Sequence, residues 1–268
     1  MTLTNENYYS PEANWAYMSV SQYKQFRKCE AAAMAQLKGE WSQPKTTALL
    51  IGSYVDAWFE GTLDQFCQEN PEIFKKDGSL KADFTQAEDI IKRVQADELF
   101  MKYMSGRKQV IRTAKLFGTQ WKIKMDSRLR DKIVDLKVMR TMERIMGKSF
   151  VEHWGYDLQM AVYAAVEEKA LKRKNPLGTY LAVVTKQIPA DLEIIKIPYW
   201  RREELLKEVE HNMPRILAVK EGREEAQRCG VCEYCRATKK LKEPIDFELV
   251  GLSTAELLAI YGKNFFTP

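Results

Sequence analysis

The sequence predicts an α/β protein in which a central sheet is flanked by helices. Three observations lead to this fold class. Apolar residues recur at helical spacing before residue 106 and again over 156–172, as in helices with one buried face. Between 109 and 138, and again over 179–188 and 192–199, the chain alternates and is rich in Ile, Val, Thr and aromatic residues, which favours strands. The expected core order is helix, three strands, helix and strand, and a further strand and a charged helix over 201–221 follow it.

The first expected helix lies near the N-terminus and spans 19–39. Ser19 and Ser21 are its candidate N-caps because their hydroxyl groups can accept hydrogen bonds from the first free backbone amides. Gly39 ends the pattern, since glycine favours the C-terminal end of a helix. Cys29 is expected inside this helix.

Two more helices are expected before the strands. One spans 47–61, and on it three positions recur every four residues and so share one face. These positions are Gly52, Asp56 and Glu60. The other opens at 85–88, where a threonine and a glutamate three positions later form a capping-box pattern. A short helix over 254–260 is expected near the C-terminal end.

Alternation within the strands assigns their side chains to the two faces of the sheet. The three strands are expected to be separated at 118–119 and around 130–131. One face is apolar and holds Trp121, Ile123, Met125, Val134, Leu136 and Val138. The opposite face collects lysines and two carboxylates, namely Lys122, Lys124, Asp126, Asp135 and Lys137. An antiparallel hairpin would bring Asp126 close to Asp135.

Two converging carboxylates beside a lysine are typical of a site for a hard cation. Mg²⁺ or Mn²⁺ takes oxygen ligands and retains waters, so Asp126 and Asp135 are the candidate ligands. Lys137 would lie beside the attacking water, where it could position it or help deprotonate it and stabilise charge on phosphorus. The chemistry indicated is phosphodiester hydrolysis. The alternative is a solvated cross-strand ion pair without a function.

The helix expected over 156–172 carries a second polar pair. Gln159 and Tyr163 are four residues apart and share one face of that helix. An amide and a phenol there could hold a nucleic-acid backbone or base. A solvated glutamine and a half-buried tyrosine are the alternative.

Five cysteines point to a metal or redox site rather than to disulfides. The N-terminus has no basic segment followed by an apolar run, so the expected compartment is the reducing cytoplasm. Cys229, Cys232 and Cys235 form a C-x2-C-x2-C run whose sulfurs can converge on one metal. Zinc and iron–sulfur sites both accept four thiolates, and Cys29 is the candidate for the fourth. Cys67 has no neighbouring cysteine and is expected to be a small buried residue.

The ordered set of acidic and polar residues resembles a known family. The set is Gly52-x-x-x-Asp56-x-x-x-Glu60, Asp126, Asp135-x-Lys137 and Gln159-x-x-x-Tyr163. It is similar to the PD-(D/E)XK nucleases, and specifically to their RecB-like and RecE-like exonuclease branch, over most of the chain. The resemblance implies a restriction-endonuclease-like αβββαβ core with a mixed central sheet.

The same resemblance implies roles for these residues. It implies that the catalytic residues are Asp126, Asp135, Lys137 and Glu60. It implies that the metal ligands are Asp56, Asp126 and Asp135. It implies that Gln159 and Tyr163 bind DNA. One position departs from the family, because the histidine of its first motif is Asp56 here. Aspartate is a competent ligand for a hard cation, so metal binding would be kept with an altered preference. Weakened catalysis is the alternative.

A second resemblance concerns the cysteines. The segment from Ser19 to Cys29 is similar to the N-terminal motif of AddB-type and CRISPR-associated nucleases, in which one N-terminal and three C-terminal cysteines hold a four-iron four-sulfur cluster. This implies such a cluster on Cys29, Cys229, Cys232 and Cys235, although the last spacing is tighter here than in AddB. Structural zinc and reduced thiols are the alternatives.

The predicted function is a Mg²⁺- or Mn²⁺-dependent deoxyribonuclease. The resemblance implies an exonuclease on double-stranded DNA ends in phage-type recombination, beside a single-strand annealing protein and in a homo-oligomer. A weakened DNA-binding module and a structural zinc protein are the alternatives. The net charge of 42 − 37 = +5 excludes a polybasic protein, and no apolar run approaches the length of a membrane span. One domain is expected over 1–268, with N-terminal helices and a cysteine-rich segment at 228–236.

Overall fold

A computed structural model describes residues 1–42, 46–241, 244, 246–252 and 256. The helices are α1 (Pro11–Ala16), α2 (Val20–Lys28), α3 (Glu30–Leu37), α4 (Thr47–Glu60), α5 (Leu63–Glu69), α6 (Ala82–Gln95), α7 (Glu98–Tyr103), α8 (Phe150–His153), α9 (Tyr156–Leu171), α10 (Tyr199–Lys220) and α11 (Glu233–Ala237), with short 3₁₀ turns at Pro71–Ile73 and Phe247–Leu249. The strands are β1 (Val110–Leu116), β2 (Thr119–Met125), β3 (Ser127–Arg128), β4 (Lys132–Met139), β5 (Gly178–Thr185) and β6 (Leu192–Ile197). In this part of the chain no helix is long and apolar enough to cross a bilayer.

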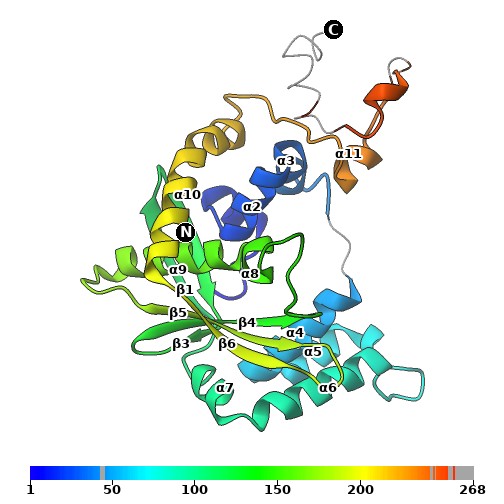
Figure 1. Cartoon of the computed structure of the whole chain (residues 1–268), viewed down its shortest axis with the longest axis vertical. Coiled ribbons are helices and arrows are strands. Elements are labelled where there is room, and N and C mark those ends of the chain that lie inside the picture. Colours follow the sequence, from blue (N-terminus) through cyan, green and yellow to red (C-terminus); the bar gives the residue numbers. More distant parts are fainter. Residues whose placement is uncertain (43–45, 242–243, 245, 253–255, 257–268) are drawn as a thin grey trace.

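The strands form a mixed sheet and an adjoining hairpin (Figure 1). The sheet has the order β3-β4-β5-β6, in which β4 and β5 run parallel and the two outer pairs run antiparallel. Strands β1 and β2 pair antiparallel in a separate two-stranded sheet. The parallel step from β4 to β5 is bridged by α8 and α9, as parallel pairing requires a crossover.

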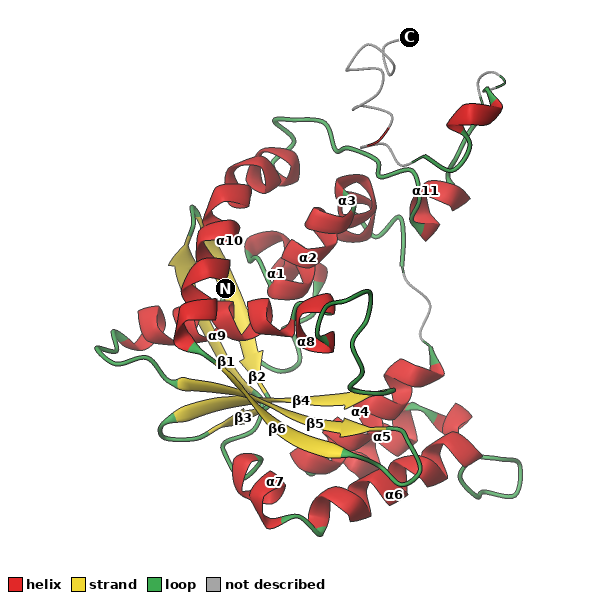
Figure 2. Cartoon of the chain, in the orientation of Figure 1, coloured by secondary structure: helices red, strands yellow, loops and turns green. Residues whose placement is uncertain are grey.

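Helices cover both faces of the sheet, as Figure 2 shows. Alternate residues of β4 and β5 enter two separate apolar cores. Ile133 and Leu181 pack with α9, α10 and the β1–β2 hairpin. Val134 and Ala182 pack on the other face against α4, α6 and α7. This arrangement confirms the predicted α/β class with a mixed central sheet.

The N-terminal helix predicted over 19–39 is broken, so one prediction is wrong. Cys29 has an extended backbone with φ −165° and ψ 108°, and it ends α2 and precedes α3. Ser19 is the N-cap of α2 and accepts from the amide of Gln22. The break aims the Cys29 side chain toward the C-terminal cysteines. A tertiary contact therefore overrides a helical pattern that is continuous in the sequence.

Two smaller predictions also need correction. Helix α6 begins at Ala82, ahead of the predicted capping box, and Glu88 accepts a hydrogen bond from the hydroxyl of Tyr54 instead of capping a helix end. The region from 109 to 138 contains four strands rather than three, because the second predicted strand ends at Met125 and a two-residue strand, β3, follows it. The helix predicted over 254–260 falls outside the described residues except for residue 256.

Candidate active site and cysteine centre

Polar residues of β2 and β4, together with Asp126 between β2 and β3, line a cleft of about 770 Å³. Helix α4 forms one side of this cleft, and α2, α9 and the N-terminal segment contribute the rest. All the candidate catalytic, metal-binding and DNA-binding residues predicted from the sequence line this cleft. They are Asp56, Glu60, Asp126, Asp135, Lys137, Gln159 and Tyr163. Gly52 does not line the cleft, and a side chain at this position would meet no atom within 4 Å.

Asp126 and Asp135 lie side by side, as the predicted hairpin requires. Ser127 pairs with Val134 in the antiparallel ladder, so the residue before Ser127 stands next to the residue after Val134. Asp126 Oδ2 accepts the backbone amide of Leu136 at 2.9 Å. Asp126, between β2 and β3, therefore reaches the backbone of β4 next to Asp135.

Two partners hold the Asp135 side chain in place. It is 2% exposed, its Oδ1 accepts the Gln159 amide at 2.7 Å, and its Oδ2 forms an ion pair with Lys137. Lys137 also lies over the Tyr156 ring, 4.8 Å from the centroid. A buried carboxylate needs such compensation, because an unpaired charge in this position would be strongly destabilising.

Burial and neighbouring carboxylates raise the pKa values of two acidic groups in the cleft. Burial raises the pKa of Asp126 well above its usual range, and the charges of Asp135 and Asp56 raise it further. Burial likewise raises the pKa of Asp56 to about 7, against the opposing charge of Lys137 and with the help of Asp135 and Glu60. Such raised values indicate a site prepared for a cation that would replace the bound protons.

The donor set fits a hard divalent cation. Carboxylate oxygens from Asp56, Asp126 and Asp135 line one cleft, and Mg²⁺ commonly uses one or two carboxylates together with waters. Among the described residues, these carboxylates do not form a group of three ligand atoms close enough to hold one ion. A cation here would therefore be held by part of the set and by solvent.

Helix α4 presents Asp56 and Glu60 to the cleft. Its N-cap Thr46 accepts from the Leu49 amide at 3.3 Å, and it ends at Gly61 in the left-handed region with φ 75°, a conformation that glycine adopts without strain. Glu60 accepts a hydrogen bond from Gln109. Burial raises the pKa of Glu60, although the charges of Lys124 and Lys108 oppose the shift.

The DNA-binding candidates on α9 have different surroundings. Gln159 binds Asp135 rather than solvent. Tyr163 is half-buried and lines the cleft, and its burial raises the pKa of the phenol well above its usual value, so the side chain stays neutral. The two residues share one helix face, as predicted.

Sequence reasoning missed several residues of the cleft. Lys24 on α2 donates to the Trp154 carbonyl at 2.9 Å, and burial together with the charge of Lys137 lowers its pKa to about 8. Tyr8 and Tyr9 enter the cleft from the N-terminal segment. No local pattern marks these residues, because only the tertiary fold brings the N-terminal segment to the sheet.

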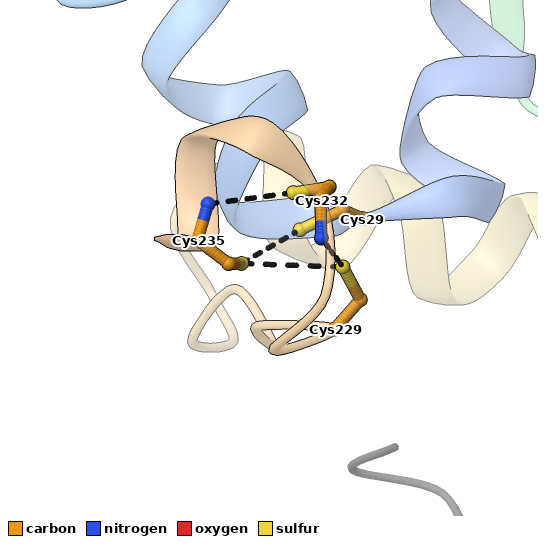
Figure 3. A group of neighbouring side chains, drawn as sticks. All are labelled: Cys29, Cys229, Cys232 and Cys235. Atoms are coloured by element: carbon orange, nitrogen blue, oxygen red, sulfur yellow. Dashed lines mark hydrogen bonds between the residues drawn. The ribbon is translucent and has the colours of Figure 1, made fainter. Parts of the chain in front are cut away.

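The four predicted cysteines converge, as Figure 3 shows. Cys29 and Cys235 have their sulfurs 3.6 Å apart, and those of Cys229 and Cys235 are 4.0 Å apart. All four ligand atoms lie within 4.8 Å of one another. Cys67 is not part of this group, as predicted, but it is half-buried rather than buried.

Backbone amides support these sulfurs. Cys229 Sγ accepts the Cys232 amide at 3.4 Å, and Cys232 Sγ accepts the Cys235 amide at the same distance. Burial raises the pKa of the Cys229 thiol, but the amides of Val231 and Cys232 outweigh this effect and lower it to about 7. Four thiolates so arranged are a complete donor set for one metal centre.

Comparisons with known proteins agree with the fold and the cleft. A family described as a PDDEXK-like domain of unknown function matches residues 19–238. The chain therefore belongs to this PDDEXK-like family, which confirms the resemblance to PD-(D/E)XK nucleases. A crystal structure from Eubacterium rectale, named "Putative exonuclease", is 50% identical with a TM-score of 0.89, over 94% of this chain and 99% of that chain. No curated protein matches the chain.

Proposed function

We propose that this protein is a metal-dependent deoxyribonuclease that digests double-stranded DNA from its ends. The observation that carries the proposal is the cleft that Asp56, half-buried Asp126 and buried Asp135 line together beside Lys137. Membership of the PDDEXK-like family and the similarity to a protein named as an exonuclease support it.

In this proposal Asp56, Asp126 and Asp135 bind Mg²⁺ or Mn²⁺, each directly or through a bound water. When bound, the cation supplies Lewis-acid activation of the phosphate and of its own water. Leu136 and Gln159 orient the two strand carboxylates through the hydrogen bonds described above. Asp56 takes the place of the family's histidine, and its raised pKa fits a ligand that exchanges a proton for a cation.

Lys137 acts as a hydrogen-bond donor in this site. Burial lowers its pKa, but the charges of Asp135 and Asp126 outweigh burial and raise it above the usual value. The ammonium group therefore stays charged at neutral pH and cannot accept a proton from water. It orients the attacking water and stabilises the negative charge that develops on the phosphate oxygens.

The other cleft residues bind and position the substrate. Gln159 fixes Asp135, and Tyr163 offers a neutral hydroxyl to the DNA backbone. Glu60 adds a further carboxylate one helical turn beyond Asp56. A single-strand annealing partner, a homo-oligomer, phage-type recombination and a cytoplasmic location stay predictions of the sequence.

The test compares linear and covalently closed circular DNA in the presence of Mg²⁺ or Mn²⁺. We expect degradation of the linear DNA alone and its loss in Asp135→Asn and Lys137→Ala. Asp131→Asn is the matched control, because Asp131 is an exposed aspartate paired with Lys132 outside the cleft. Activity that persists in both site variants would show that the catalytic residues are misassigned. If the unmodified protein binds DNA without cutting it, the alternative of a catalytically weakened DNA-binding module would be favoured instead.

We also propose that Cys29, Cys229, Cys232 and Cys235 hold a structural metal centre. The resemblance implies a four-iron cluster, whereas the spacing favours a single ion. Zinc–sulfur bonds of about 2.3 Å in a tetrahedron place the sulfurs about 3.8 Å apart, close to the observed 3.6 and 4.0 Å. Thiolates on four different irons of a cluster would lie further apart.

Metal analysis of protein purified without oxygen separates these centres. One equivalent of zinc in colourless protein would establish the single ion, and brown protein with about four irons would establish the cluster. Either centre would fasten the N-terminal helices to the segment at 228–236. We propose on this basis that residues 1–268 form one domain.

A further inference from the structure

An exposed aromatic side chain lies at the catalytic cleft without a place in the proposed chemistry. Tyr9 lines the same cleft as Asp126 and Asp135, yet it is 68% exposed. It precedes α1 and lies before residue 19, where the match to the PDDEXK-like family begins. Single exposed aromatic residues are common on protein surfaces, so the position of Tyr9 in the cleft is what makes it a candidate for ligand contact.

The ring of Tyr9 rests on a fixed support. It meets the ring of Tyr8 edge to face, with centroids 4.9 Å apart, and the Lys124 ammonium lies 4.8 Å from its centroid. Its carbonyl accepts the Asn14 side-chain amide at 3.2 Å. Tyr8 itself is buried, with 5% of its surface exposed. The Tyr9 side chain is therefore presented on a packed neighbour.

Two buried lysines fasten the backbone of this N-terminal segment. Lys122 is 1% exposed, and its ammonium donates to the Tyr8 carbonyl and, at 2.8 Å, to Asn14 Oδ1. Lys220 donates to the Asn14 carbonyl at 2.9 Å and to the Tyr17 carbonyl at 3.1 Å. Because the segment is already ordered, a ligand that binds Tyr9 loses little free energy to ordering it.

The chemistry around Tyr9 selects a nucleobase. An aromatic ring beside a lysine offers stacking to a base and an ion pair to the attached phosphate. A purely apolar ligand does not fit, because the cleft is lined with lysines and carboxylates. The flat face of a base is accessible when it is unpaired or lies at the end of a duplex.

We propose that Tyr9 stacks on a terminal or unpaired base of the DNA strand that enters the cleft, and that Lys124 binds a phosphate of that strand. The inference rests on the proposed nuclease function and adds to it a residue that binds a base of the entering strand. It assigns the N-terminal segment a part in substrate binding. The stacking ring holds the strand next to the carboxylates.

The test measures binding of a labelled single-stranded oligonucleotide by fluorescence anisotropy, in an Asp135→Asn background that prevents cleavage. Tyr9→Ala is expected to weaken binding by about 10-fold or more, the range seen when base–aromatic stacking is removed. Tyr9→Phe and Tyr9→Trp should bind like the parent protein. Tyr199→Ala is the matched control, because Tyr199 is an exposed tyrosine on α10 that does not line the cleft.

A second measurement identifies the base itself. A series of oligonucleotides carries one abasic position each, at a different place in each member. At one place the missing base should weaken binding by the parent protein. The same missing base should not weaken binding by Tyr9→Ala any further, because that variant has already lost the stacking contact. Unchanged affinity in Tyr9→Ala, or equal losses in Tyr9→Ala and Tyr9→Phe, would overturn the inference. If the unmodified protein neither binds nor cuts DNA, the proposed nuclease function itself fails.

Discussion

Gln159 donates its side-chain amide to Asp135 Oδ1 over 2.7 Å. The bond joins α9 to β4, so the helix that crosses the sheet supports the carboxylate from which the site is built. Asp135 is thereby held between an amide on one oxygen and the Lys137 ammonium on the other. Gln159, which the family resemblance assigns to DNA binding, therefore also positions Asp135, the proposed metal ligand.

Gln159→Ala should therefore slow cleavage of linear DNA by about 10- to 100-fold. Loss of a hydrogen bond to a charged group costs about 1.5–3 kcal/mol, and about 1.4 kcal/mol is a tenfold change in rate. The measurement is the initial rate of nucleotide release. Gln86→Ala is the control, since the Gln86 amide bonds the Lys186 carbonyl outside the cleft. Equal rates for the two variants would contradict the positioning role of Gln159.

The effect of Mg²⁺ on thermal stability should grow with pH. The pKa of Asp56 is about 7 in the folded chain against 3.8 for the free side chain. Between these pH values the folded state binds more protons than the unfolded state. The contribution of Asp56 to the free energy of unfolding is therefore present at low pH and is lost as the pH rises to about 7. Above that pH the carboxylate is free to bind a cation in place of the proton, so Mg²⁺ should stabilise the protein more.

The measurement is Tm with and without Mg²⁺ at pH 5 and pH 8. We expect Mg²⁺ to raise Tm by several degrees more at pH 8, since about 1 kcal/mol shifts Tm by about 2–4 °C in a chain of this size. Asp56→Asn should reduce the difference, whereas Asp89→Asn, in an exposed ion pair with Lys92, should keep it. The same Mg²⁺ effect at both pH values would argue against Asp56 as a ligand.

Cys29→Ser should release the metal from the cysteine centre and lower Tm by several degrees. Metal binding to such a site contributes directly to folding free energy, and Cys29 is its one ligand on the N-terminal side. Metal content and Tm are measured on the same preparation. Cys67→Ser is the control, because Cys67 lies outside the group. Full metal content in Cys29→Ser would exclude Cys29 as a ligand.

Glu167→Ala should lower the free energy of unfolding by about 3–5 kcal/mol, the range for breaking a buried ion pair. Glu167 is fully buried on α9 and pairs with Arg128 at 2.8 Å and Arg112 at 3.2 Å. Its removal leaves two cations without their partner. Urea denaturation measures the change, and Glu210→Ala, at an exposed position of α10, should alter stability little. A change below about 1 kcal/mol would show that the pair is not needed for stability.

The strands were predictable because alternation is a local property, but the prediction of one shared apolar face was wrong. Trp121, Ile123 and Met125 pack in the core with α9 and α10, whereas Val134 and Leu136 pack in the other core with α4 and α6. Asp135 and Lys137 fall on one face of β4 whatever the rest of the chain does, and the antiparallel register puts Asp126 next to Asp135. The break at Cys29 was not predictable in this way. Its cause is the sulfur of Cys235, 206 positions away, and the amino acids around Cys29 favour a continuous helix.

The sequence by itself determined the class of fold, the donor types of both candidate sites and the spacing that puts Asp126 beside Asp135. Tertiary structure decided which distant groups join them. It brought Lys24 and Tyr9 to the cleft and Gln159 onto Asp135, and it placed Cys29 with the C-terminal cysteines. The physical reason is range: periodicity and hairpin register act between neighbours in the chain, whereas burial and charge compensation act between whichever groups the packed fold brings into contact.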